Sequence, residues 1–219
     1  MVATDEMARP ELHVEGRDDF HVLRELLARH GLATGATSPD PRSPRFGVAD
    51  GVERLLDAID VAVRAAGDRP VGFVLDADLS LSSRWQAVCD RVREVGMAPP
   101  EDPPAEGYID VAEDYKATVG VWLMPDNQRE GKLEDFLCNL IAEGDALIGH
   151  AGEATAKATE IDMRFADGDE PKAILHTWLA WQNRPGCPYG TAVRAKYFDH
   201  NAEVAQRFVD WFKRLYGIE

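Results

Sequence analysis

The feature that most restricts the fold of this chain is a pair of uninterrupted apolar runs, Val71–Leu75 and Thr118–Met124. A strand with one face in water alternates apolar and polar residues, whereas a continuous apolar run is typical of a strand covered on both faces in a parallel sheet. Apolar residues at helical spacing precede, separate and follow these runs, in residues 51–66, 82–95 and 133–141. Strands that alternate with helices predict an α/β domain with a largely parallel sheet flanked by helices.

The two ends of the chain add further elements to this pattern. Residues 11–15 form a β-prone run, residues 18–30 have helical spacing, and residues 45–49 read as a brief strand. Beyond about residue 150 the strand pattern stops, and helices are predicted over residues 153–165, 171–182 and 201–216. We therefore expect an α/β domain over residues 1–145 and a helical C-terminal extension over residues 146–219, packed on the domain because its aromatic side chains need burial.

The charge of the chain is strongly negative and unevenly distributed. The 219 residues include 24 Lys and Arg against 39 Asp and Glu, a net charge of −15. Residues 171–219 hold seven basic and four acidic residues, hence +3, which leaves −18 on residues 1–170. Tight, unspecific binding to nucleic acid depends on Lys and Arg, so this composition argues against it. The acids of the first part either face water or gather around cations.

Other features bear on the compartment. Charged residues precede any apolar stretch near the start (Asp5, Glu6, Arg9), an order that does not fit a secretory signal, and no apolar run is long enough to span a membrane. The three cysteines have no partner at zinc-site spacing and are interpreted as reduced thiols: Cys89, Cys138 and Cys187. We expect a cytoplasmic protein without a membrane partner.

Acidic residues follow the predicted strands at the points where the strands end. Because the carboxyl ends of parallel strands meet at one edge of a sheet, these side chains are expected to lie close together. Their oxygen ligands favour Mg²⁺ or Mn²⁺ as the bound cation. The residues are Glu15 after the first strand, Asp76 and Asp78 after the Val71–Leu75 run, Asp126 after the Thr118–Met124 run, and Asp18, Asp19, Glu134 and Asp135 in the first turns of helices.

Another interpretation of some of these acids needs no metal. Carboxylates in the first turn of a helix cap its N–H groups and complement its dipole, which would account for Asp18, Asp19, Glu134 and Asp135. It accounts less well for Asp76 and Asp78, because two carboxylates directly after a buried strand repel each other. An acidic scaffold without any metal site is a third interpretation, in which Mg²⁺ leaves the melting temperature unchanged.

Two motifs carry a resemblance to a known family. The sequence Val-Glu-Gly-Arg-Asp-Asp at residues 14–19, between a strand and a helix, and Val-Leu-Asp-Ala-Asp at residues 74–78, after a later strand, resemble the TOPRIM domain. That domain occurs in topoisomerases, bacterial primases, a ribosomal-RNA maturation nuclease and the overcoming-lysogenisation-defect nucleases. Residues 121–128, 133–136 and 176–182 also resemble a group of small, mostly uncharacterised prokaryotic TOPRIM-related proteins. The wider resemblance covers about residues 1–145; the narrower one covers nearly the whole chain.

The resemblance implies roles for individual residues. Glu15 matches the TOPRIM glutamate that acts as general acid/base or metal ligand, and Asp76 and Asp78 match the pair that holds a metal. Asp19 matches an acid that the nuclease branch uses for a second metal, with Glu134 or Asp126 as a further ligand. The implied activity is phosphodiester cleavage with Mg²⁺ or Mn²⁺. Topoisomerase and primase activities are not expected, because no strand-passage domain, catalytic tyrosine or primase zinc module is recognisable.

A few residues are candidates for contact with nucleic acid. Lys132 lies near a strand end, where it could neutralise developing charge. An ordinary solvated lysine needs no such role, and we favour that interpretation. Arg184, Arg194 and Lys196 are candidates for phosphate contacts. The tail residues His176, Trp178, Trp181 and Gln182 suggest a stacking surface for unpaired bases, but aromatic residues at helical spacing are more often core, and we favour the core interpretation.

Together these patterns predict a Mg²⁺- or Mn²⁺-dependent nuclease, or a related phosphodiester-transfer enzyme, that acts on DNA or RNA. The alternative is a non-catalytic TOPRIM-like module that binds metal, nucleotide or protein. Weak binding to nucleic acid is expected, and the sequence leaves a protein partner or self-association open.

Overall fold

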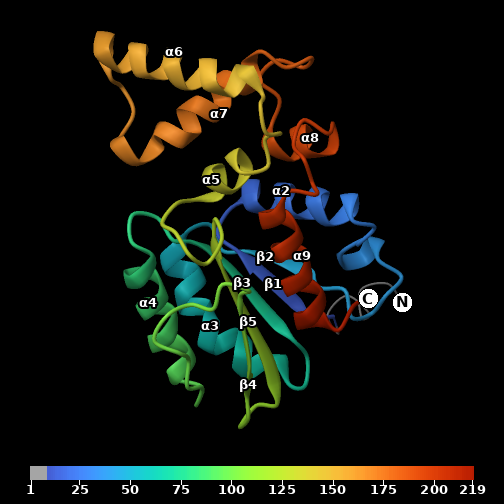
Figure 1. Cartoon of the computed structure of the whole chain (residues 1–219). Coiled ribbons are helices and arrows are strands. Elements are labelled where there is room, and N and C mark those ends of the chain that lie inside the picture. Colours follow the sequence, from blue (N-terminus) through green and yellow to red (C-terminus); the bar gives the residue numbers. More distant parts are fainter. Residues whose placement is uncertain (1–8) are drawn as a thin grey trace.

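The computed structural model describes residues 9–219, apart from the side chain of Asp167. It contains one five-stranded sheet in the order β2-β1-β3-β5-β4 (Figure 1). The first four strands of that order run parallel, and β4 pairs antiparallel with β5 at the edge. The strands are β1 (Glu11–Val14), β2 (Arg45–Val48), β3 (Val71–Asp76), β4 (Tyr108–Ala112) and β5 (Ala117–Met124). The predicted α/β class with a largely parallel sheet is confirmed.

Helices cover both faces of the sheet (Figure 1). On one face, α2 (Arg17–Arg29) and α9 (Glu203–Tyr216) pack on side chains such as Leu12, Val74 and Trp122. On the other face, α3 (Val52–Ala66) and α4 (Leu81–Arg93) pack on alternate residues of the same strands, such as Phe73 and Leu75. Successive side chains of a strand point to opposite faces, so the uninterrupted apolar runs fill two cores at once.

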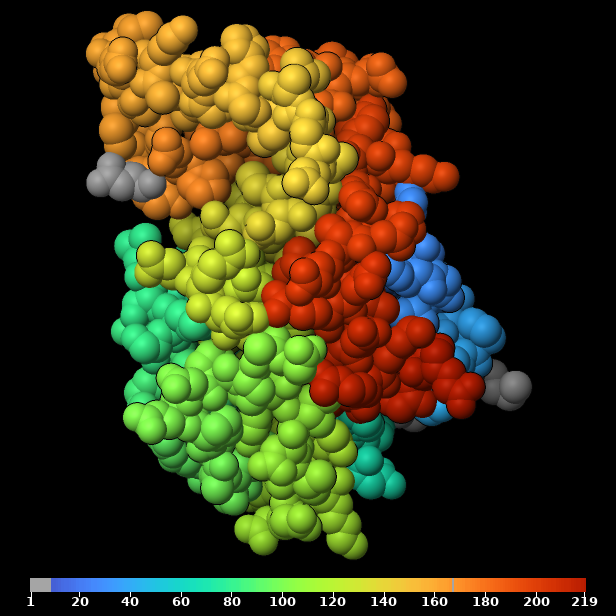
Figure 2. Space-filling model, viewed as in Figure 1, coloured from blue at the N-terminus to red at the C-terminus, as the bar shows by residue number. Residues whose placement is uncertain are grey.

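The last helix, α9, lies directly on the sheet because two glycines make room for it. Gly72 on β3 pairs with Gly120 on β5. A Cβ atom at Gly72 would lie 2.6 Å from the Tyr216 hydroxyl, and one at Gly120 would lie 2.5 Å from Leu215 Cδ2. Figure 2 shows this C-terminal segment, in red, between the N-terminal region in blue and the middle of the chain in green. In the structure, α9 therefore packs directly on the sheet.

The remaining helices follow β5. The helix α5 (Leu133–Cys138) lies at the carboxyl end of the sheet, next to β5 (Figure 1). The helices α6 (Ala146–Asp162) and α7 (Glu170–Ala180) form a hairpin beyond the strand ends. The first hairpin helix begins seven residues before the predicted start, because Asp145 accepts hydrogen bonds from the backbone N–H groups of Leu147 and Ile148 and so caps it. The short helix α8 (Tyr189–Arg194) and strand β4 were not predicted. Two 3₁₀ turns complete the structure, η1 (Gly35–Thr37) and η2 (Asp167–Asp169).

Some predictions concern the chain ends and the cysteines. Asp5 and Glu6, which argued against a secretory signal, lie outside the described residues. Within residues 9–219, no helix combines the length and the apolar character needed to cross a membrane. Cys89, Cys138 and Cys187 are free thiols.

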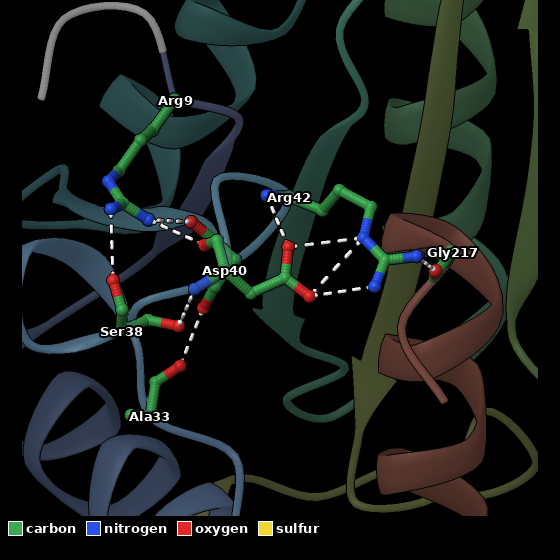
Figure 3. A network of polar contacts seen from close by, with 7 residues as sticks. Arg9, Ala33, Ser38, Asp40, Arg42 and Gly217 are labelled. Atoms are coloured by element: carbon green, nitrogen blue, oxygen red, sulfur yellow. Dashed lines mark hydrogen bonds and ion pairs between the residues drawn. The ribbon is translucent and has the colours of Figure 1, made fainter. Parts of the chain in front are cut away.

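Arg9 ties the start of β1 to the loop that precedes β2 (Figure 3). Its guanidinium group donates to the backbone carbonyls of Asp40, Ser38 and Ser43 at 2.7, 3.0 and 3.4 Å. The Asp40 carboxylate in turn binds Arg42, which donates to the carbonyl of Gly217 after α9. Only 8% of the surface of Arg9 is exposed, so the interactions of this arginine are shielded from water.

Replacing Arg9 by Ala is expected to lower the free energy of unfolding by about 2–3 kcal/mol, because buried carbonyls lose charged donors. The matched control is Arg42→Ala, which removes an exposed arginine from the same network and should destabilise the protein much less, because water screens its ion pair with Asp40. Urea denaturation with unchanged m-values measures both effects. Equal destabilisation by the two variants would contradict the assigned role of Arg9.

Candidate functional site

The carboxyl ends of the parallel strands open into a cavity of about 310 Å³, which we call the acidic pocket. Asp76 is the last residue of β3, Asp19 is in the first turn of α2, and Glu134 is in the first turn of α5. The lining residues are Gly16, Arg17, Asp18, Asp19, Asp76, Lys132, Leu133, Glu134, Asp169 and Lys172. The structure therefore brings three of the predicted acids together from three separate segments.

Glu15 belongs to this cluster although it is not among the lining residues. Its Oε1 atom accepts a hydrogen bond of 2.9 Å from the backbone N–H of Asp76. Asp76 Oδ1 accepts from the backbone N–H of Leu133 at 3.0 Å, and Asp19 Oδ2 accepts from that of Gly16 at 3.0 Å. Each carboxylate thus has one backbone donor. These bonds join the ends of β1 and β3 to the start of α5.

Burial and mutual repulsion raise the pKa values of these acids. Desolvation, followed by the nearby charge of Glu15, raises the pKa of Asp19 to about 7. Desolvation also raises the pKa of Asp76 well above its usual range, with Asp19 and Glu15 as the next causes. The pKa of Glu15 is raised mainly by desolvation. The three groups are close enough for their charges to interact, and a proton or a cation would relieve the repulsion.

Asp78 lies apart from the acidic pocket. The sequence pattern allowed Asp76 and Asp78 to point the same way if the backbone stayed extended, but Asp78 has a φ of 53° and pairs with Gly131 in an isolated bridge. Its carboxylate binds the guanidinium group of Arg84, and its Oδ1 atom lies 3.8 Å from Lys132 Nζ. Both oxygens of Asp78 therefore face cations.

Glu134 has partners that the sequence did not reveal. The hydroxyl group of Tyr189, a buried residue of α8, lies 3.5 Å from Glu134 Oε1 and 3.0 Å from His176 Nε2. Lys172 Nζ lies 3.6 Å from the same carboxylate oxygen. The helix that carries Tyr189 approaches α2 closely, and Gly190 allows this approach: a Cβ atom at this position would lie 2.8 Å from His21 Cβ. This close packing places Tyr189 beside the acidic pocket.

A comparison with known protein families adds one finding. The model of a family described as a protein of unknown function, DUF3226, matches residues 9–217. The chain belongs to the DUF3226 family. No curated protein and no solved structure matches the chain.

The matched region of this DUF3226 chain includes the sheet, the hairpin and α9, and so all residues of the acidic pocket. The family description names no activity. Any function assigned to the pocket therefore depends on its chemistry and geometry.

The donor set of the acidic pocket fits a hard divalent cation. Carboxylate oxygens are the ligands that Mg²⁺ and Mn²⁺ prefer, and burial, followed by repulsion from neighbouring carboxylates, raises the pKa values of Asp19 and Asp76. Among the described residues, however, no group of three or more His, Cys, Asp or Glu side chains is arranged to hold a metal ion. Each of the three central carboxylates instead accepts a hydrogen bond from a backbone N–H group, which leaves further lone pairs on each carboxylate for a cation.

Most of the other predicted residues lie away from the acidic pocket. Asp126 is buried and accepts hydrogen bonds from the backbone N–H groups of Gln128 and Arg129 and from the Arg129 side chain, which accounts for it as a turn residue. Lys132 lines the pocket. The other basic candidates do not: Arg184 is in the loop before α8, Arg194 ends α8 beside Glu25, and Lys196 follows it.

The predicted aromatic surface is divided. Trp178 is in the core, as the favoured interpretation predicted, and its side chain is 1% exposed. Trp181 is 41% exposed and stacks on His150 with ring centroids 5.2 Å apart. His176 stacks on Tyr189, and Gln182 donates to the carbonyl of Trp178. The four side chains therefore do not form one continuous surface.

Proposed function

We propose that this protein binds Mg²⁺ or Mn²⁺ at the acidic pocket and hydrolyses phosphodiester bonds of DNA or RNA. The observation that carries the proposal is the convergence of Glu15, Asp19 and Asp76 at the carboxyl edge of a parallel sheet, where burial and repulsion raise all three pKa values. Buried carboxylates crowded in this way are common at functional sites. The order of the two motifs, which resembles that of TOPRIM nucleases, supports the same activity.

The residues of the pocket have distinct roles in this proposal. Asp19, Asp76 and Glu134 would hold the cation, which supplies charge stabilisation and lowers the pKa of bound water when present. Glu15 Oε2 accepts no hydrogen bond among the described residues and would take the proton of the attacking water. The raised pKa of Glu15 favours this role, because a general base works best when its pKa is near the working pH.

Positive side chains complete the proposed site. Arg17, Lys132 and Lys172 line the acidic pocket together with its carboxylates. In this proposal they would neutralise charge on the phosphate oxygens of a substrate as the reaction proceeds. Lys132 is held in position by Asp169, whose Oδ1 atom lies 3.4 Å from Lys132 Nζ.

A cleavage assay tests the proposal. Single- and double-stranded DNA and RNA are incubated with the purified protein in Mg²⁺ or Mn²⁺, with EDTA as the control. We expect cleavage of at least one substrate and none in EDTA. Lack of cleavage of all four substrates under both metals would contradict the proposed activity.

A second candidate is a non-catalytic module that binds metal, nucleotide or protein. The observations that favour it are the pairing of both Asp78 oxygens with Arg84 and Lys132 and the lack of a preformed metal-binding arrangement among the described residues. A calorimetric titration that shows Mn²⁺ binding, combined with no turnover of any nucleic acid, would select this candidate over the nuclease.

A further inference from the structure

A second cavity, of about 490 Å³, lies beside the acidic pocket. We call it the Ser83 pocket. It lies between the β3–α4 segment and the segment that joins the two hairpin helices, and it shares Lys132 and Asp169 with the acidic pocket. Its lining residues are Ala77, Asp78, Leu79, Ser80, Ser83, Arg84, Lys132, Ala166, Gly168 and Asp169. Its volume is within the range of small-molecule sites and suits a single nucleotide unit.

The cations of the Ser83 pocket are fixed in place by the protein. Arg84 Nε donates to the backbone carbonyl of Asp76 at 2.8 Å, and the same guanidinium group binds Asp78. Lys132 Nζ lies between Asp78 and Asp169, at 3.8 and 3.4 Å. Side chains that are already ordered lose little conformational entropy when a ligand binds them. Arg84 and Lys132 therefore form a preorganised pair of donors.

Hydroxyl groups line the same cavity. Ser80 Oγ donates to Ser83 Oγ at 2.8 Å, and Ser80 Oγ also accepts from the Ser83 backbone N–H. The proton of the Ser83 hydroxyl is not used in that bond and is available to a ligand. An arginine, a lysine and a hydroxyl group together are donors suited to phosphate oxygens.

The two pockets differ in the charge of their lining residues. The acidic pocket has five acidic and three basic lining residues, whereas the Ser83 pocket has two of each. An anionic group therefore meets less repulsion in the Ser83 pocket. Asp76 links the two, because its carboxylate belongs to the acidic pocket and its carbonyl holds Arg84.

We propose that the Ser83 pocket binds one phosphate group of a nucleic-acid strand while the neighbouring phosphodiester bond of the same strand lies at the acidic pocket. This proposal rests on the proposed function, and it names the subsite that positions the strand. The phosphate is either the terminal monoester of a strand or an internal diester. Arg84, Lys132 and Ser83 are its donors.

A pair of charge-adding variants tests the Ser83 pocket. Ser83→Glu places a carboxylate in the cavity at the third position of α4, where a Glu three residues after Ser80 completes a capping box, so the fold is retained. Ser82→Glu is the matched control, because it adds the same charge to the same helical turn at an exposed residue outside the pocket lining. A salt concentration of about 0.15 M screens electrostatic interactions beyond about 8 Å, so the two variants differ mainly in the local charge that they add.

Fluorescence anisotropy then measures the Kd of a short, labelled single-stranded DNA for the full chain, in Ca²⁺ and separately in EDTA. We expect Ser83→Glu to weaken binding at least about tenfold and Ser82→Glu to change it less than about threefold. Tighter binding of a 5′-phosphorylated strand than of a 5′-hydroxyl strand would show that the Ser83 pocket binds the terminal monoester. Equal binding of the two strands would show that it binds an internal diester. Circular dichroism checks the fold of both variants.

The results separate this proposal from the proposed function. Three results would overturn the proposal for the Ser83 pocket. Ser83→Glu could bind the strand as tightly as the wild type, both variants could weaken binding equally, or the wild type could fail to bind the strand. If the strand binds in a Ser83-dependent way but is not cleaved in Mg²⁺ or Mn²⁺, the result would support the Ser83 pocket and contradict only the proposed nuclease activity.

Discussion

Asp76→Asn is expected to slow the proposed phosphodiester cleavage at least about 10³-fold, because the change removes the negative charge of a proposed metal ligand from the centre of the acidic pocket. The fold should survive, since the amide oxygen of Asn can still accept the hydrogen bond that Asp76 Oδ1 receives from the backbone N–H of Leu133. Initial rates on the preferred substrate in saturating Mg²⁺ measure the effect. Glu15→Gln, which removes the proposed base, should reduce the rate to a similar extent.

Two further variants make this prediction specific. Asp78→Asn should reduce cleavage only about tenfold, because Asp78 lies outside the acidic pocket and already binds Arg84 and Lys132. This differs from the TOPRIM resemblance, which assigns the same role to Asp76 and Asp78. Asp110→Asn changes an exposed acid on β4 and should leave the rate within about threefold. Cleavage by Asp76→Asn at the wild-type rate would refute the assignment of the pocket.

The sequence predicted those parts of the molecule that depend on local patterns. Continuous apolar runs require strands covered on both faces, and β3 and β5 lie where the runs are. Acids directly after parallel strands must lie at one edge of the sheet, and Glu15 and Asp76 do so. The strand β4 was missed because it is a short edge strand with three of its five residues partly or fully exposed, so it has no continuous apolar run.

The parts that were missed depend on contacts between distant segments. The left-handed backbone of Asp78 accompanies its bridge to Gly131, and no local pattern shows that pairing. The helix α8 has six residues, follows Pro188 and contains Gly190, so helical periodicity cannot reveal it. Tyr189 and Lys172 reach Glu134 only through the packing of α8 and α7 beside α5. A site built from several elements is thus only partly visible in the sequence.

The stability of the protein in EDTA is expected to fall as the pH rises from about 4 to about 7. The folded-state pKa of Asp19 is about 7, against 3.8 for an ordinary Asp, so the folded protein binds more protons than the unfolded chain across this interval. Protonated Asp19 therefore contributes stability that is complete below pH 3.8 and lost as the pH passes through 7. The loss is on the order of 3 kcal/mol, or about 6–12 °C in Tm. Thermal denaturation at fixed ionic strength measures it.

Glu11 provides the opposite dependence at lower pH. A hydrogen bond and the charge of His13, together with Arg45, lower its pKa to about 2, although burial opposes them. The stability that Glu11 contributes is present above pH 4.5 and is lost as the pH falls towards 2. In EDTA, the stability contributed by Glu11 is therefore lost towards low pH, and the stability contributed by protonated Asp19 is lost towards neutral pH.

Asp19→Asn isolates the contribution of Asp19 from that of the other groups. The amide keeps an acceptor for the Gly16 N–H but carries no charge, so this variant should be more stable than the wild type at pH 8 in EDTA. Its decline in stability between pH 4 and 7 should be smaller, and the remainder is due to Asp76 and Glu15, whose pKa values are also raised. Asp135→Asn is the matched control. Asp135 caps α5 through the backbone N–H of Lys132 as Asp19 caps α2, but it does not line the pocket.

Divalent cations should act on the same charge. At pH 8, Mg²⁺ is expected to raise the Tm of the wild type and of Asp135→Asn, because the cation relieves the repulsion among Glu15, Asp19 and Asp76. At pH 5 the rise should shrink, since protons then occupy the raised-pKa carboxyls and compete with the cation. Asp19→Asn should respond less at both pH values. A Tm that is independent of Mg²⁺ at pH 8 would instead identify the acidic cluster as a scaffold without a metal site.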